Sequence, residues 1–200
     1  MKKISLIAVI VTLFTASLGF ACDDKKCPEC EKGKQANASF ESLKKLAGNW
    51  EGKTSMSGTE ETVKASYEVT SGGAAVVEKI FAGTPHEMVS IYYPEGKTVK
   101  MTHYCMVGNR PVMTLKSSTD KNLAFEMNGH EGIGSKKEMH MHALDVLWNS
   151  ENQFTQNWTS FDKGKKSESV TFVWNRVEDK PAPAVAPTKP TKSSGNKSTK

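Results

Sequence analysis

Apolar and polar positions alternate along most of the chain after residue 48, and this period of two is typical of half-buried β-strands. The alternating runs are short, and Gly, Pro, Asn and Asp residues, which favour turns, separate them. Ten strands are predicted, at residues 49–56, 61–70, 74–81, 86–93, 97–105, 111–117, 122–127, 137–148, 153–160 and 167–177. Because no helices alternate with these runs, the pattern predicts an all-β fold, an antiparallel up-and-down barrel or sandwich.

A helical period stands just before the strands. Phe40, Leu43 and Leu46 recur at helical spacing, Ser39 is a suitable N-cap, and Gly48 ends the turn. We therefore expect a short N-terminal helical turn that leads into one domain at residues 40–178.

The first 21 residues have the pattern of a secretory signal peptide. Lys2 and Lys3 precede an apolar run at 4–18, and small residues occur where a cleavage site needs them. We expect removal of residues 1–21 and a periplasmic or secreted protein. Cys22 follows the expected cut, so a membrane lipoprotein anchored through Cys22 is the alternative.

Residues 22–39 are polar and are predicted to form a linker that carries Cys22, Cys27 and Cys30. In an oxidising compartment these thiols favour a disulfide or a lipid anchor. The Cys-x-x-Cys pair also leaves metal binding or redox work open, although a zinc site needs two more ligands.

The tail at 179–200 is rich in Pro and Lys and has few large apolar residues, so it is predicted to be disordered. Its five lysines match the net charge of +5, and the folded segment carries no basic excess. A nucleic-acid-binding domain needs a basic face, so we expect no nucleic-acid partner. The tail itself is either a solubilising tether or a contact for an anionic envelope surface.

Motifs at both ends of the predicted domain resemble those of a known group of proteins. "LAGNW" at 46–50 opens the first strand and "FVWNRV" at 172–177 closes the last, and this arrangement resembles the calycin group of lipocalins and fatty-acid-binding proteins. Segments such as "SGGAAVVE", "GTPHEM" and "THYCMVGN" are similar to uncharacterised secreted lipocalin-like bacterial proteins. The resemblance implies that Trp50 packs over the closed end of a barrel near Arg176, in a structural role. It also makes a small hydrophobic or planar molecule the expected ligand, lipid-like or haem, since some calycin-like barrels bind haem through histidine.

The richest local chemistry lies in "THYCMVGN", residues 102–109. On strand 97–105, Met101, His103 and Cys105 share a face, and Lys100 marks the opposite face as solvent-exposed. We therefore expect His103 and Cys105 to point into the barrel. Gly108 and Asn109 are predicted to form a hairpin turn.

The preceding strand, 86–93, offers two faces. Either His86, Met88, Ser90 and Tyr92 point inward, or Glu87, Val89, Ile91 and Tyr93 do. The first choice completes a candidate ligand-binding set, which consists of His103, Cys105, Met101, Tyr92, His86 and Met88.

A second histidine pair, His140 and His142, lies on one face of strand 137–148. The spacing suits metal ligation, but the opposite face is more apolar, which favours exposure of both imidazoles to solvent.

We expect an exported binding protein whose barrel cavity holds a small hydrophobic or planar ligand. Two alternatives stay open. One is a structural envelope protein with a solidly packed barrel, and the other is an enzyme that uses His103 as acid or base. The chain shows no paired carboxylates and no catalytic triad motif, so no reaction is predicted.

Overall fold

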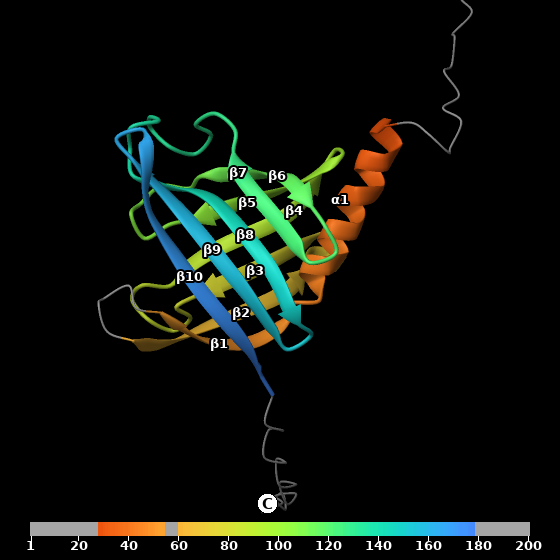
Figure 1. Ribbon diagram of the computed structural model, residues 1–200, viewed down its shortest axis with the longest axis horizontal. Helices are drawn as coiled ribbons and strands as arrows, with labels where there is room; N and C mark the ends of the chain where they lie inside the picture. Colours follow the sequence, from red (N-terminus) through yellow and green to blue (C-terminus); the bar gives the residue numbers. More distant parts are fainter. Residues whose placement is uncertain (1–27, 55–59, 179–200) are drawn as a thin grey trace, which may run out of the picture.

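The computed structural model describes residues 28–54 and 60–178. Ten antiparallel strands form one closed barrel, in which each strand pairs with its neighbours in the chain and β1 also pairs with β10 (Figure 1). The strands are β1 (Gly48–Thr54), β2 (Glu61–Thr70), β3 (Ala75–Ile80), β4 (Met88–Glu95), β5 (Thr98–Tyr104), β6 (Val112–Ser118), β7 (Asn122–Met127), β8 (His140–Ser150), β9 (Gln153–Asp162) and β10 (Lys165–Val177). The predicted all-β barrel is therefore confirmed, with small shifts at the strand ends.

Alternation along the strands places the core inside the barrel. In β7, for example, Leu123, Phe125 and Met127 are buried, and the residues between them are partly exposed. Hydrogen-bond pairing all the way round leaves no strand edge open among the described residues, as expected of a closed barrel.

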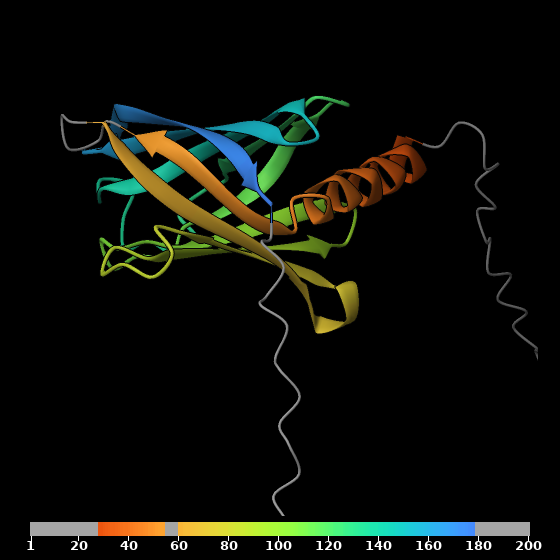
Figure 2. The same cartoon turned by 90° about the horizontal axis from the view of Figure 1, so that it is seen from below.

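Helix α1 (Pro28–Lys44) lies across one end of the barrel, against β4 and β5 (Figure 2). Phe40 and Leu43 are buried there, Gln35 donates a hydrogen bond to the Ser118 hydroxyl, and the Ser118 and Ser39 hydroxyl oxygens lie 2.7 Å apart. The helix begins well before Ser39, which lies inside it and donates to the Gln35 carbonyl rather than capping the first turn. We call this covered end the closed end.

Arg176 closes the same end. Its guanidinium carbon lies 4.2 Å from the centroid of the Trp50 ring, and its two terminal nitrogens donate to the carbonyls of Ala47 and Lys45. Gly48 makes room for it, because a Cβ there would lie 2.9 Å from an Arg176 nitrogen. Stacking and hydrogen bonding together seal the barrel beneath α1.

The opposite end, which we call the open end, carries the loops at 81–87, 105–111, 128–139 and 163–164. Asn109 joins two of them, because its side-chain nitrogen donates to Glu138 Oε1 and to the Met139 carbonyl, each at 2.8 Å. A hairpin turn is present at residues 105–108, with Gly108 at a φ of 91° and the Gly108 N–H donating to the Cys105 carbonyl. The predicted turn pair is therefore correct for Gly108, whereas Asn109 follows the turn and has no positive φ.

The predicted signal peptide, Cys22, Cys27 and the tail at 179–200 lie outside the described residues, so those interpretations stay predictions. In the described ranges, no helix combines the length and apolar character needed to cross a membrane.

Candidate functional site

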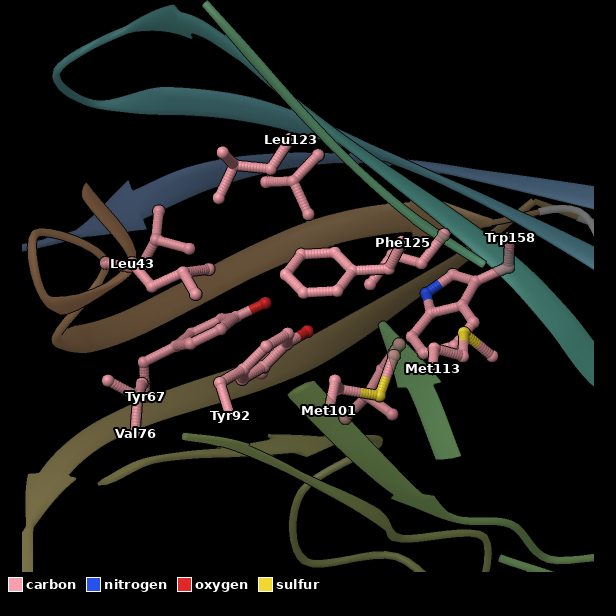
Figure 3. Close-up of a cluster of buried hydrophobic side chains, with 14 of the residues drawn as sticks. Leu43, Tyr67, Val76, Tyr92, Met101, Met113, Leu123, Phe125 and Trp158 are labelled. Atoms are coloured by element: carbon pink, nitrogen blue, oxygen red, sulfur yellow. The ribbon is translucent and has the colours of Figure 1, made fainter. Parts of the chain in front are cut away.

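Large side chains fill the barrel interior from the closed end toward the open end. Figure 3 shows Leu43 beside Tyr67 and Tyr92, then Phe125 and Met101, and finally Trp158. Each of these side chains is at most 4% exposed. The closed half of the barrel is therefore a packed core.

A carboxylate lies at the centre of this core. Glu78 on β3 has no exposed surface, and its Oε1 accepts a hydrogen bond from the Tyr67 hydroxyl while its Oε2 accepts one from the Tyr92 hydroxyl, both at 2.7 Å. Gln156 donates to Glu78 Oε1, also at 2.7 Å, and its own side-chain oxygen accepts from Trp174 Nε1. A buried carboxylate needs such donors, because the cost of removing it from water is otherwise prohibitive.

Both tyrosines are held in the phenol form. Burial, followed by the charge of Glu78, raises the pKa of Tyr67 and that of Tyr92 well above the usual value. These phenols therefore act as hydrogen-bond donors to Glu78 and do not supply a negative charge.

His103 lies in the open half of the barrel, 1% exposed. Its Nδ1 is 3.0 Å from the Ser90 hydroxyl oxygen, and its ring centroid is 4.7 Å from that of Trp158. Within the described part of the chain, neither His103 Nε2 nor Trp158 Nε1 has a hydrogen-bond partner. Burial lowers the pKa of His103 to about 4, so the imidazole is neutral at neutral pH.

A small cavity adjoins these two rings. Its volume is about 20 Å³, enough for roughly one water molecule. Its walls are His103, Trp158, Ile80, Phe81, Met88, Met141, Val170 and Phe172. Among these described wall residues none carries a charge at neutral pH, so the cavity suits a neutral, mainly apolar group.

Phe81 lines both this cavity and a groove at the open end. The groove has a volume of about 540 Å³, and Phe81 lines it together with Val63, Ala82, Met106 and several polar residues. The Phe81 backbone has a φ of 57°, a left-handed conformation that non-glycine residues rarely adopt. One partly buried aromatic ring thus lines both the small cavity and the surface groove.

The predicted ligand-binding residues are distributed over different places. Met88 and His103 line the cavity, and His86 lines the outer groove, where it is exposed in the turn before β4. Cys105 is half-buried, with its Sγ 4.0 Å from Met88 Sδ, and burial raises the pKa of its thiol. Met101 and Tyr92 have no exposed surface and belong to the core between cavity and closed end.

The histidine pair on β8 is partly buried. His140 is only 2% exposed, its Nδ1 is 2.7 Å from the Glu138 carbonyl, and its Nε2 is 3.1 Å from His142 Nδ1. A bulge between Met141 and Ala143 turns this part of β8, so the expected exposure of both imidazoles is wrong for His140. The described residues contain no cluster of three or more His, Cys, Asp or Glu side chains that could hold a metal ion.

Cys30, one of the three cysteines predicted to form a disulfide or lipid anchor, lies near the start of α1. It forms no disulfide within the described ranges. Its expected partners, Cys22 and Cys27, lie outside them.

Sequence reasoning missed Glu78, Gln156 and Phe81. Glu78 shares the inward face of β3 with Val76 and Ile80, so the apolar neighbours two positions away on each side were the available signal. Nothing in the sequence marks the left-handed backbone of Phe81.

No family model matches the chain, and no curated protein matches it. Among solved structures, the chain is similar to the crystal structure of Rv2717c from M. tuberculosis, with a TM-score of 0.49 and 14% sequence identity over 70% of this chain and 98% of that chain. A similarity at this level supports no conclusion about function, and the barrel assignment rests on the strand pairing.

Proposed function

We propose that this protein is a binding protein that takes a small, mainly apolar molecule into the open half of its barrel. The supporting observation is the position of Phe81, whose side chain is the shared wall of the buried cavity and the outer groove. Movement of one side chain would join the two spaces.

The size of the cavity decides how a ligand enters. Sites for small molecules usually have volumes of roughly 300–1,000 Å³, and the closed cavity is far smaller, whereas the groove falls in that range. The left-handed backbone of Phe81 costs on the order of 1–3 kcal/mol, so the surrounding structure holds this residue in its place between the two spaces. We infer that the ligand occupies the groove and extends past Phe81 toward His103.

The uncharged walls of the cavity select the kind of ligand that can enter it. His103 is neutral at neutral pH, and the other described wall residues are uncharged, so a carboxylate or ammonium group at the cavity would be desolvated without a counter-charge. A charged end of a ligand belongs in the groove, whose lining includes Glu61, Lys64 and His86. The part that enters the cavity is neutral.

Haem is a narrower version of the same proposal. His103 Nε2 has no partner in the described structure and is the ring nitrogen that an axial ligand would use. Against haem stands the cavity volume, since a porphyrin needs displacement of several wall side chains and not of Phe81 alone.

The cellular setting is part of the proposal and rests on the sequence. The signal-peptide pattern supports export to the periplasm or beyond, with lipid attachment at Cys22 as the alternative, and the basic tail supports contact with an anionic envelope surface.

The test uses N-phenyl-1-naphthylamine, a neutral probe whose fluorescence rises in apolar surroundings. We expect a saturable 1:1 fluorescence increase with the purified protein, and a faster association rate for Phe81→Ala. Val107→Ala, which truncates an exposed apolar side chain at the same end, is the matched control and keeps the wild-type rate. Absence of saturable binding in both the wild-type protein and Phe81→Ala would overturn the proposal.

A parallel titration with haem separates the narrower version. A Soret band that disappears in His103→Phe supports haem binding through this residue. An unchanged haem spectrum together with naphthylamine binding leaves the apolar-ligand proposal in place without haem.

A further inference from the structure

Three loops at the open end form one continuous surface. The Arg110 N–H donates a hydrogen bond to the Gly132 carbonyl at 3.0 Å, which joins the first loop to the second. The Lys163 N–H donates to the Lys137 carbonyl, also at 3.0 Å, which joins the second loop to the third. We call this surface the loop face, and it consists of residues 105–111, 128–139 and 162–166.

Exposed apolar side chains gather on and beside the loop face. Met106 is 56% exposed and Val107 is 50% exposed, and the two follow each other at the tip of the turn that Gly108 closes. Met139 of the neighbouring loop and Tyr104 at the end of β5 are also exposed. These four are the majority of the seven large apolar side chains that are exposed among the described residues. An apolar cluster at protruding loop tips is typical of an interaction surface.

Basic charge is concentrated on the same face. The loop face has three acidic side chains and six basic ones, a net charge of +3, and the basic ones are Arg110, Lys136, Lys137, Lys163, Lys165 and Lys166. The predicted domain at 40–178 has 16 basic and 17 acidic side chains in all, so the rest of it carries a net charge of −4. The barrel therefore has one basic end, although the domain as a whole has no basic excess.

The acidic side chains of the loop face already have partners. Glu131 lies 3.7 Å from Lys100 Nζ, and Asp162 lies 4.0 Å from Lys163 Nζ. Glu138 accepts hydrogen bonds at both of its carboxylate oxygens. In the part of the chain that the structure describes, the other five basic side chains of the face form no ion pair, and all five are exposed. Their charge is available to an anionic partner.

We propose that the loop face docks on an anionic lipid bilayer, with Met106 and Val107 entering the apolar region and the basic side chains contacting lipid phosphates. A bilayer surface has a charged layer directly above an apolar one, so it matches both features of the face at once. The inference goes beyond ligand binding. Because Met106 also lines the groove, the docked orientation would let an apolar ligand pass between bilayer and groove.

Two other partners fit the face less well. A nucleic acid supplies phosphates but leaves Met106 and Val107 in water. A second copy of this chain, docked through the same face, would bring two surfaces of like charge together. The basic tail is a separate basic element, because β10 ends at Val177 at the closed end and the chain continues from there.

Vesicle flotation of the full chain tests the apolar contact. We expect binding to vesicles of equal parts phosphatidylcholine and phosphatidylglycerol, weaker binding as NaCl rises, and much weaker binding to phosphatidylcholine alone. Val107→Asp should weaken binding to the mixed vesicles by about tenfold or more, since it removes the apolar contact and adds a like charge. Val69→Asp, at an exposed valine of the closed end, is the matched control and keeps wild-type binding.

The basic contact is tested with a second pair of variants. A lysine near an anionic surface strengthens binding by roughly fivefold, so Lys136→Gln with Lys137→Gln should weaken it by about tenfold or more. Lys34→Gln with Lys45→Gln, at two exposed lysines of helix α1, is the matched control and keeps most of the binding. Circular dichroism of each variant checks that the barrel is folded.

Brominated lipids report the orientation of the bound protein. The indole introduced by Val107→Trp should be quenched by brominated lipids in the mixed vesicles, beyond any quenching of the wild-type protein. The indole introduced by Val69→Trp should show no such excess, because it lies at the closed end. Equal quenching of the two introduced indoles would overturn the proposed orientation.

The outcomes separate this proposal from the ligand-binding function. A full chain that does not float with the mixed vesicles overturns the docking proposal. Equal binding by the wild-type protein, Val107→Asp and the Lys136 and Lys137 variant also overturns it, and assigns vesicle binding to the tail or to helix α1. Val107 does not line the groove, so naphthylamine binding without vesicles should be the same in Val107→Asp, and either proposal can fail alone.

Discussion

Tyr92 donates a hydrogen bond to Glu78 Oε2 at 2.7 Å, at a point in the barrel where neither side chain has any exposed surface. Residues from β2, β3, β4 and β9 meet at this carboxylate, so strands far apart in the sequence are joined by polar contacts inside an apolar core. A satisfied buried network of this kind favours one arrangement of the core over others, because a shifted register would leave its members without partners.

Removal of the Tyr92 hydroxyl should destabilise the fold. Tyr92→Phe leaves a buried carboxylate oxygen one donor short, and we expect the free energy of unfolding to fall by roughly 1.5–3 kcal/mol. Urea denaturation measures the change. Tyr93→Phe, at a half-buried tyrosine whose hydroxyl lies 3.4 Å from Thr102 Oγ1, is the matched control and should cost less than about 1 kcal/mol. Equal losses for the two variants would contradict the role given to Glu78.

Arg176 offers a test of the closed end. Arg176→Lys keeps the charge but replaces the planar group that stacks on Trp50 and donates to two carbonyls, and we expect a loss of about 2 kcal/mol in unfolding free energy. Arg110→Lys, at an exposed arginine of the open end, should change stability by about 0.5 kcal/mol or less. Thermal and urea denaturation of both variants decide the comparison.

The strands of this barrel were predictable because alternation and turn residues are local signals. β7 and β2 match their predicted bounds, and β8 starts later than predicted because residues 137–139 lie in the open-end loop that Asn109 holds. The length of helix α1 was underestimated, because its first half is polar and packs through one face only. Periodicity identified the part of the helix that is buried and missed the part that is exposed.

The candidate site was predictable only in part, because its contacts join residues that lie far apart in the sequence. Alternation along β5 correctly placed His103 inside the barrel. The partners of Glu78 come from residues 11 to 78 positions away, and no local pattern connects Glu78 with Gln156. A carboxylate on an otherwise apolar face became interpretable only after the fold brought Tyr67 and Tyr92 to it.

The contact between Asn109 and Glu138 should control the open-end loops. Asn109→Ala removes hydrogen bonds to Glu138 Oε1 and the Met139 carbonyl, and it also frees the carboxylate that accepts from the Gly134 N–H. We expect a loss of about 1–2 kcal/mol in stability and faster amide exchange at Gly134. Asn149→Ala, an exposed asparagine at the closed end, is the control and should leave Gly134 exchange unchanged. Unchanged Gly134 exchange in Asn109→Ala would contradict this role.

Burial of neutral His103 predicts an acid-dependent loss of stability with a defined sign. Its pKa is about 4 in the folded protein against 6.5 for an exposed imidazole, so between these pH values the unfolded chain binds a proton that the folded protein does not. The contribution of His103 is therefore fully present above pH 6.5 and is lost as the pH falls toward 4, by about 3 kcal/mol in total. His103→Phe removes this titration, so its unfolding free energy should fall less steeply over the same range, whatever its stability at pH 7. Parallel slopes for the two proteins in urea denaturation from pH 7 to pH 4 would show that His103 is accessible to protons in the folded state, contrary to its position beside the cavity.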